Sequence, residues 1–266
     1  MLHTPANLSK DSVVLSLING QSPILQDAYI HGVRFDRQKL TDSANASTFV
    51  DCQFSKCDLR EFQVFGSKFL NCVFEQTKLE VFGAWDSDGT PSCFRNCSFI
   101  WKNIRKLAFG GVLDGCRMDG TMTGCSFRSS VIDTTFSGKL IDCEFGGRVG
   151  SVPLDGRHVV LTRCDFSEVK IFDVEFNDVF VEDCKFPDLA CFAIVNGYSA
   201  VLSEIISILE RYSIRSEGYI YQLRRSGGRQ RIGVLNLNWV EKFVSQNAAK
   251  AEVLAVIEAN RLQAPG

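Results

Sequence analysis

Apolar residues recur in this sequence with a period of five, and this spacing restricts the possible folds more than any other feature. One run places them at eight successive positions: Phe49, Phe54, Leu59, Val64, Phe69, Phe74, Leu79 and Ala84. The register resumes after a gap at Gly89, and a second run extends from Leu161 to Phe186. A period of five matches neither an α-helix nor a flat strand. It fits a chain that turns a corner every five residues, so that four sides of about 20 residues in total make one square coil.

A second inward series lies two residues before each apolar centre. In the first run it comprises Ser47, Cys52, Cys57, Phe62, Ser67, Cys72, Thr77 and Phe82. Nine of the 11 cysteines occupy this position: Cys52, Cys57, Cys72, Cys97, Cys116, Cys125, Cys143, Cys164 and Cys184. Fourteen of the 21 phenylalanines occupy centres: Phe35, Phe49, Phe54, Phe69, Phe74, Phe94, Phe99, Phe109, Phe127, Phe136, Phe145, Phe166, Phe176 and Phe186. Free cysteine behaves as a small buried apolar residue, so we expect structural thiols and no bound metal or cofactor.

The pattern resembles the repeat of the pentapeptide-repeat family, in which a small and a polar residue precede Leu or Phe. The segments 52–56 (CQFSK), 57–61 (CDLRE) and 164–168 (CDFSE) match this motif. The resemblance implies a mainly β fold, a right-handed quadrilateral parallel β-helix of about eight coils. The register slips several times between Phe109 and Leu161, and the segment 146–157 carries no repeat. We expect that segment and a second one, containing Trp85, Asp86 and Asp88, to project from the coils as loops.

The periodicity divides the chain into three parts. We expect an N-terminal cap at residues 1–22, the β-helix at 23–190 and a helical C-terminal region at 191–266. Apolar residues at helical spacing predict one amphipathic helix after Asn196. A second helix is predicted from Asn238, with Glu241 completing a capping box, to about Arg261. Because the end of a β-helix exposes unpaired strand groups, these helices could cap the coil, dimerise or dock on a partner, and the sequence leaves all three open.

Composition excludes several classes of protein. The chain has 266 residues, of which 45% are hydrophobic, so it can bury a core. A net charge of −2 is unlike the strongly basic balance of a general nucleic-acid binder, and we expect no direct nucleic-acid partner. No run of 18 apolar residues predicts a membrane span, and the first ten residues lack the pattern of a signal peptide. We therefore expect a cytoplasmic protein.

The sequence shows no arrangement typical of a catalytic site. Its three histidines, His3, His31 and His158, lie far apart in the chain. Acidic residues gather in the last predicted coils, at Asp173, Glu175, Asp178, Glu182 and Asp183. Paired carboxylates on a β-helix can cleave carbohydrates, and such an enzyme is one alternative. We favour a protein that is not an enzyme, because no further residues converge with these acids.

Charge segregation indicates protein contacts instead. Four arginines, Arg224, Arg225, Arg229 and Arg231, lie in one short glycine-containing segment. This segment and the acidic residues of the last coils are our candidate partner-binding residues, and Trp85, Asp86 and Asp88 are noted only as a projecting loop. The sequence therefore predicts a non-catalytic scaffold or adaptor for protein partners, for example in a bacterial immunity or antiviral defence assembly, with a homodimer through the C-terminal helices as one form.

The family resemblance implies one further alternative, a topoisomerase-protection protein that imitates DNA and shields gyrase. Residues 31–190 contain 19 basic and 23 acidic residues, a net charge of −4. Eight coils would span about 40 Å at the strand spacing of a sheet. Duplex DNA carries one charge per ~1.7 Å, so this charge is a poor copy of a duplex. For this reason we prefer the scaffold.

Overall fold

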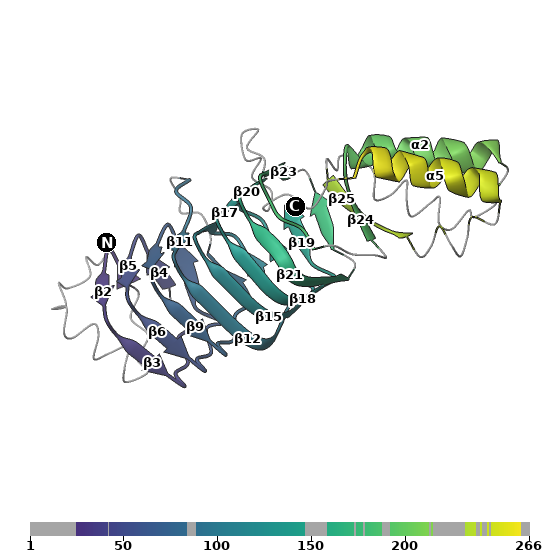
Figure 1. Cartoon of the computed structure of the whole chain (residues 1–266). Coiled ribbons are helices and arrows are strands. Elements are labelled where there is room, and N and C mark those ends of the chain that lie inside the picture. The colour runs from purple at the N-terminus through teal and green to yellow at the C-terminus, as the bar shows by residue number, and fades with distance from the viewer. Residues whose placement is uncertain are drawn as a thin grey trace.

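In the computed structural model, four flat faces of short parallel strands wind around one continuous core. The structure describes residues 25–41, 43–83, 89–146, 159–172, 174–177, 179–187, 192–212, 214, 232–237, 240, 244 and 246–261. Successive coils follow one another along a rod, and two helices lie beyond its C-terminal end (Figure 1). The predicted mainly β solenoid with a helical C-terminal region is confirmed.

Each face is a stack of strands from successive coils. Face 1 contains β1 (Leu25–Gln26), β4 (Ser43–Asn45), β7 (Gln63–Phe65), β10 (Val81–Phe82), β13 (Ala108–Phe109), β16 (Ser126–Phe127), β19 (Glu144–Gly146) and β22 (Glu175–Asn177). Face 2 contains β2 (Tyr29–His31), β5 (Thr48–Val50), β8 (Lys68–Leu70), β11 (Cys93–Arg95), β14 (Val112–Asp114), β17 (Val131–Ile132), β20 (Val159–Thr162) and β23 (Val179–Glu182). Face 3 contains β3 (Arg34–Asp36), β6 (Gln53–Ser55), β9 (Val73–Glu75), β12 (Ser98–Arg105), β15 (Arg117–Thr123), β18 (Thr135–Ile141) and β21 (Asp165–Phe172).

Face 4 changes character along the rod. In the first coils it consists of isolated bridges that join Lys39, Asp58 and Lys78. From β12 onwards it is formed by the C-terminal halves of the long strands of face 3, which continue around the corner. Eight strands stack on face 2 and seven on face 3, so the predicted eight coils correspond to about seven complete turns.

The centres of the five-residue repeat point into the coil and are buried. Phe35, Phe54, Phe74 and Phe99 stack face to face, with ring centroids 4.7–4.8 Å apart. All fourteen predicted phenylalanine centres belong to the core cluster. Stacking of like residues on like is the reason that a short repeat can build a core, because no single coil could bury its own inner face.

The predicted register is wrong at one position. The sequence pattern places Ala84 at a centre and Phe82 two residues before it. In the structure, Phe82 pairs with Phe109 and is itself the buried centre of face 1. The chain therefore reaches face 1 three residues after Leu79, two residues earlier than the repeat predicts.

Glycine accounts for two of the register slips after Phe109, whereas the four-residue step from Phe127 to Val131 contains no glycine. Met118 and Met122 are both buried centres, yet they are only four residues apart, and Gly120 lies at the corner between them with a φ of 132°. A Cβ at Gly120 would lie 1.9 Å from the carbonyl oxygen of Trp101 in the preceding coil. Gly138 occupies the same place in the next coil, paired with Gly120. Each tight corner thus removes one residue from the repeat.

The C-terminal region begins with a strand pair that the sequence did not predict. β24 (Phe192–Asn196) pairs antiparallel with β25 (Ile232–Asn236). Ile194 of β24 belongs to the core of the coil, whereas Ala193 and Val195 belong to a second core with the helices. The strand β24 therefore separates the two cores.

Two complete helices lie among the described residues of this region. α2 (Tyr198–Arg211) is the helix predicted after Asn196, and it packs against α5 (Asn247–Ala259). The predicted second helix from Asn238 is wrong as one continuous element, because Gln246 has an extended backbone at the start of α5. Asn238 and Glu241 lie outside the described residues, as does the predicted cap at residues 1–22.

Candidate functional site

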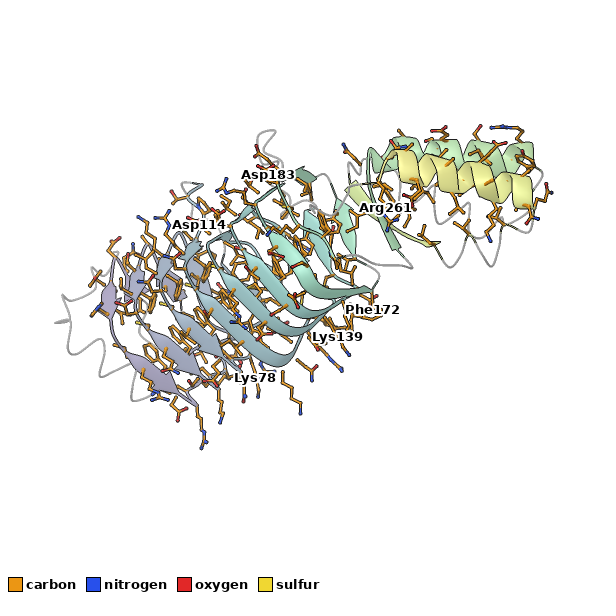
Figure 2. All side chains as sticks on the ribbon, viewed as in Figure 1. Lys78, Asp114, Lys139, Phe172, Asp183 and Arg261 are labelled. Atoms are coloured by element: carbon orange, nitrogen blue, oxygen red, sulfur yellow. The ribbon has the colours of Figure 1, made fainter. Side chains whose placement is uncertain are left out.

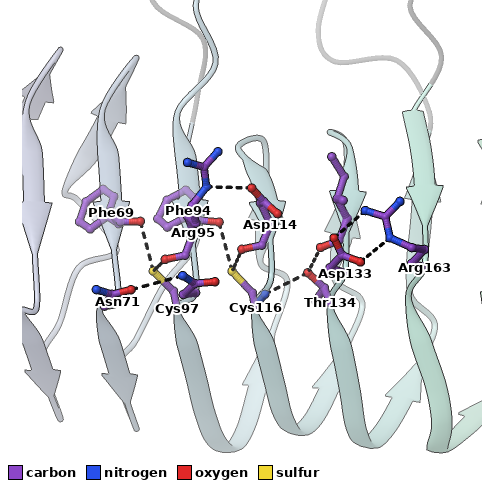
Figure 3. A network of polar contacts seen from close by, with 12 residues as sticks. Phe69, Asn71, Phe94, Arg95, Cys97, Asp114, Cys116, Asp133, Thr134 and Arg163 are labelled. Carbon is purple, nitrogen blue, oxygen red and sulfur yellow. Dashed lines mark hydrogen bonds and ion pairs between the residues drawn. The ribbon is translucent and has the colours of Figure 1, made fainter.

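The thiols form part of the wall of the coil. One row follows the corner between faces 2 and 3 and contains Cys52, Cys72, Cys97, Cys116, Thr134, Cys164 and Cys184. Cys97 donates to the carbonyl of Phe69 at 3.3 Å, and Cys116 donates to that of Phe94 at 3.2 Å (Figure 3). Each contact adds a weak hydrogen bond between the thiol and a backbone carbonyl of the preceding coil.

Burial keeps reagents away from these thiols, since Cys52, Cys72, Cys97, Cys116 and Cys164 are at most 3% exposed. Desolvation raises the pKa of Cys57, whereas the hydrogen bond between neighbouring thiols raises the pKa of Cys97 and lowers that of Cys116. A thiol must lose its proton to react or to bind a metal. Within the described ranges, no three His, Cys, Asp or Glu side chains are grouped so that they could hold a metal ion. The row is therefore a structural feature of the coil.

Face 2 carries apolar side chains on its outer surface. Val50 and Leu70 are register partners on neighbouring strands, and both are partly exposed. Val112, Ile132 and Val160 are likewise partly exposed on β14, β17 and β20, and Tyr29 of β2 is 51% exposed. These six residues, which we call the apolar row, lie in two register columns of face 2, and the same columns also hold Lys68 and the ion pair of Arg95 with Asp114.

A polar corner borders the apolar row. Asn96 donates to Asn71 at 3.4 Å, and Asn71 donates to Asp51 at 3.1 Å. Further along the same corner, Arg163 pairs with Asp133 through two contacts of 2.6 Å, which lower the pKa of the Asp133 carboxyl (Figure 3). These side chains fix one another in position, so the corner forms an ordered polar rim beside the apolar row.

Face 4, in contrast, is basic. Over residues 39–41, 58–61, 78–80, 102–106, 121–124, 139–142 and 169–172 it carries eight basic and four acidic residues. The basic residues are Lys39, Arg60, Lys78, Lys102, Arg105, Lys106, Lys139 and Lys170, and the acidic ones are Asp58, Glu61, Glu80 and Asp142. Lys78 and Lys139 lie along one edge of the rod and Asp114 and Asp183 along the other (Figure 2). Charge is therefore segregated between faces.

The structure divides the predicted acidic residues between two faces. Glu182 ends β23 on face 2, and the exposed Asp183 follows it at the polar corner. Both carboxylates help to raise the pKa of Arg163. Glu175 lies on β22 of face 1. The remaining predicted site residues lie outside the described residues: Asp173, Asp178, Trp85, Asp86, Asp88, Arg224, Arg225, Arg229 and Arg231.

Sequence reasoning did not single out the apolar row. Each of its residues lies next to a buried centre, and the repeat predicts an outward side chain there. Only the coil length, which varies from turn to turn, decides which of these side chains share a face. An alignment of the coils on their inner cysteines would have shown which of these side chains share a face.

Histidine contributes no catalytic arrangement among the described residues. His31 lies on face 2 with its Nε2 atom 3.1 Å from Asp51 Oδ2, and both side chains are about half exposed. His3 and His158 lie outside the described residues. None of the helices that the structure describes is long and apolar enough to span a bilayer.

Comparison with known proteins gives likeness of fold alone. No protein-family model and no curated protein matches the chain. Among solved structures, trypsin-treated QnrB1, a plasmid-mediated fluoroquinolone resistance protein, is 20% identical over 60% of this chain and 68% of its own, with a TM-score of 0.24. HetL, a pentapeptide-repeat protein involved in heterocyst differentiation regulation from the cyanobacterium Nostoc sp. strain PCC 7120, is 9% identical over 67% of this chain and 97% of its own, with a TM-score of 0.27. At these TM-scores the likeness carries no argument about partners.

The repeat and the coil themselves define the class. Five-residue units, inward Phe or Leu centres, small inner residues and four faces of parallel strands characterise a pentapeptide-repeat β-helix, and this chain shows all of them. The C-terminal strand pair with two helices is an addition to that β-helix.

Proposed function

We propose that this protein is a non-catalytic scaffold that binds a protein partner through face 2. The observation that carries the proposal is the apolar row, in which partly exposed Val50, Leu70, Val112, Ile132 and Val160 lie on a flat sheet face. Protein interfaces combine an apolar centre with a polar rim. The polar corner supplies such a rim, since its side chains are already held by one another.

The backbone of face 2 is suited to this role because it is rigid. Each of its strands is paired with neighbours in the stack, and its inner side chains belong to the continuous core. A partner would meet side chains that are already ordered, so little conformational entropy would be lost on binding. A rigid face supports a role in binding rather than in catalysis. The thiols of the inner row support the same role, because their burial keeps them from acting as nucleophiles.

The surface gives less support to the DNA-mimicking alternative. Imitation of a duplex needs closely spaced negative charge, whereas face 4 has an excess of basic residues. The predicted acids that the structure describes lie on two different faces. A role in an immunity assembly is compatible with a scaffold, and the identity of the partner would decide it.

Affinity capture from native lysate tests the proposal. The test variant is Leu70→Glu with Ile132→Glu, which places two charges within the apolar row. The matched control is Ile100→Glu with Phe172→Glu, which changes two exposed apolar residues, 39% and 43% exposed, outside face 2. Circular dichroism melting first confirms that both variants fold.

We expect the test variant to lose at least about tenfold in recovered partner, as for the loss of central interface residues. The control should retain it. Unchanged capture by the folded test variant would show that face 2 is not the binding surface. Mass photometry of the wild-type eluate distinguishes a different protein from a second copy of this chain.

A further inference from the structure

The ladder of face 4 is interrupted at one level of the rod. Below it, Lys39, Asp58 and Lys78 are bridged in sequence, and above it Asn103 pairs with Thr121. Between these levels the strand β12 pairs with β9 only over Ser98–Ile100, although it pairs with β15 as far as Arg105. The two halves of face 4 therefore separate where β12 leaves β9.

Trp101 occupies the break. Its indole Nε1 donates to the carbonyl of Thr77 at 3.0 Å, in place of a backbone donor from the next strand. The ring is only 4% exposed and lies against Phe99. Trp101 thus seals the core beneath the break while the outer surface stays open.

The break forms a cavity of about 360 Å³. Besides the buried Thr77, its polar lining consists of Arg60, Lys78, Lys102, Arg105, Gln76 and Asn103. All six side chains are exposed, so they can reach a bound molecule from solvent. The cavity brings together four cations and two amides from three successive coils.

Only one of these cations is compensated by an ion pair within the described part of the chain. Arg60 pairs with Asp58, with contacts of 2.9 and 2.6 Å. No described carboxylate lies within ion-pair distance of Lys78, Lys102 or Arg105. Asp58 also attracts Lys78 from beyond ion-pair distance, whereas Lys102 and Arg105 have no such neighbour among the ion pairs of the described residues. The excess of positive charge around the cavity favours an anion that carries several charges.

We propose that this cavity binds a multivalent phosphate ligand of the pyrophosphate type. The planar fork of Arg105 fits phosphate oxygens, and Lys78 and Lys102 supply ammonium donors. Gln76 and Asn103 can donate from their amides. The volume is near the lower end of small-molecule sites, which favours a compact, highly charged group over an extended acidic peptide. The site lies on face 4, so it stands independently of the scaffold role of face 2.

Isothermal titration of the full-length protein with sodium pyrophosphate tests the site. The cavity variant is Lys102→Glu with Arg105→Glu. The matched control is Lys139→Glu with Lys170→Glu, a register pair on the same face outside the cavity. Both variants change the net charge equally, so a difference between them reports the cavity rather than general electrostatics. If the cavity variant does not fold, Lys102→Gln with Arg105→Gln replaces it, with Lys139→Gln with Lys170→Gln as its control.

We expect saturable binding by the wild-type protein, a loss of at least about tenfold in the cavity variant and less than about twofold in the control. Absence of saturable binding, or an equal loss in both variants, would overturn the proposal. Inorganic phosphate and an aspartate-rich peptide are titrated in parallel. Tighter binding of pyrophosphate than of either supports a multivalent phosphate, whereas tighter binding of the peptide would assign the cavity to an acidic protein segment and refute it.

Discussion

Replacement of Gly120 by alanine tests the tight corners that shorten the coil. In Gly120→Ala, the new Cβ would lie 1.9 Å from the carbonyl oxygen and 2.8 Å from the carbonyl carbon of Trp101. Both atoms belong to backbone, so no side-chain rotation relieves the clash. The φ of 132° adds strain of about 1–3 kcal/mol for a residue with a Cβ. With the local shift of β15 away from β12, we expect a total loss of about 4 kcal/mol in the free energy of unfolding.

Gly124→Ala is the matched control. Gly124 lies in the same coil with a φ of 62°, and a Cβ there would meet no atom within 4 Å. Its cost is therefore the backbone term alone, about 1 kcal/mol. Urea unfolding followed by tryptophan fluorescence compares the two variants, since Trp101 lies at the affected contact. Equal losses in both variants would refute the close approach and with it the physical reason for the four-residue steps at Gly120 and Gly138.

Three further perturbations have defined outcomes. Phe74→Ala should cost about 3–5 kcal/mol, because Phe74 stacks between two rings, whereas Phe172→Ala should cost under about 0.5 kcal/mol; similar urea midpoints would contradict the stacked core. The Arg60 guanidinium lowers the pKa of Asp58 from 3.8 to about 2, so the stabilising effect of Asp58 is present above pH 3.8 and is lost as the pH falls towards 2. Asp58→Asn should remove this part of the acid sensitivity, under about 1 kcal/mol at an exposed pair, and an unchanged acid melting profile would exclude it. Cys97 should resist a thiol reagent until the protein unfolds, as read by mass spectrometry of labelled peptides, and rapid labelling of the native protein would show that the inner row is accessible.

The repeat alone was sufficient to predict the coil and its core. A Phe or Leu every five residues, with Cys two places earlier, can bury both series only if the chain turns at each unit. The fourteen phenylalanine centres are accordingly buried. The register at Phe82 was not predictable in this way, because Ala84 and Phe82 both fit an inward position and only the pairing with Phe109 distinguishes them.

Features that depend on how neighbouring coils are aligned could not be predicted from the sequence. The apolar row joins residues such as Leu70 and Ile132, which are separated by three coils of unequal length. The cavity depends on the loss of pairing between β12 and β9 after Ile100. The strand β24 was missed because its alternation follows two cores, with Ile194 facing one and Val195 the other.

Site-specific photo-crosslinking tests the central claim, that face 2 binds a protein partner, most directly. A photoreactive phenylalanine analogue replaces Leu70 in one variant, Ile132 in a second and Phe172 of face 4 in a third, and each is irradiated in native lysate. The account predicts the same crosslinked partner from both positions of face 2 and none from Phe172. A partner that crosslinks only from Phe172, or equally from all three positions, would contradict it.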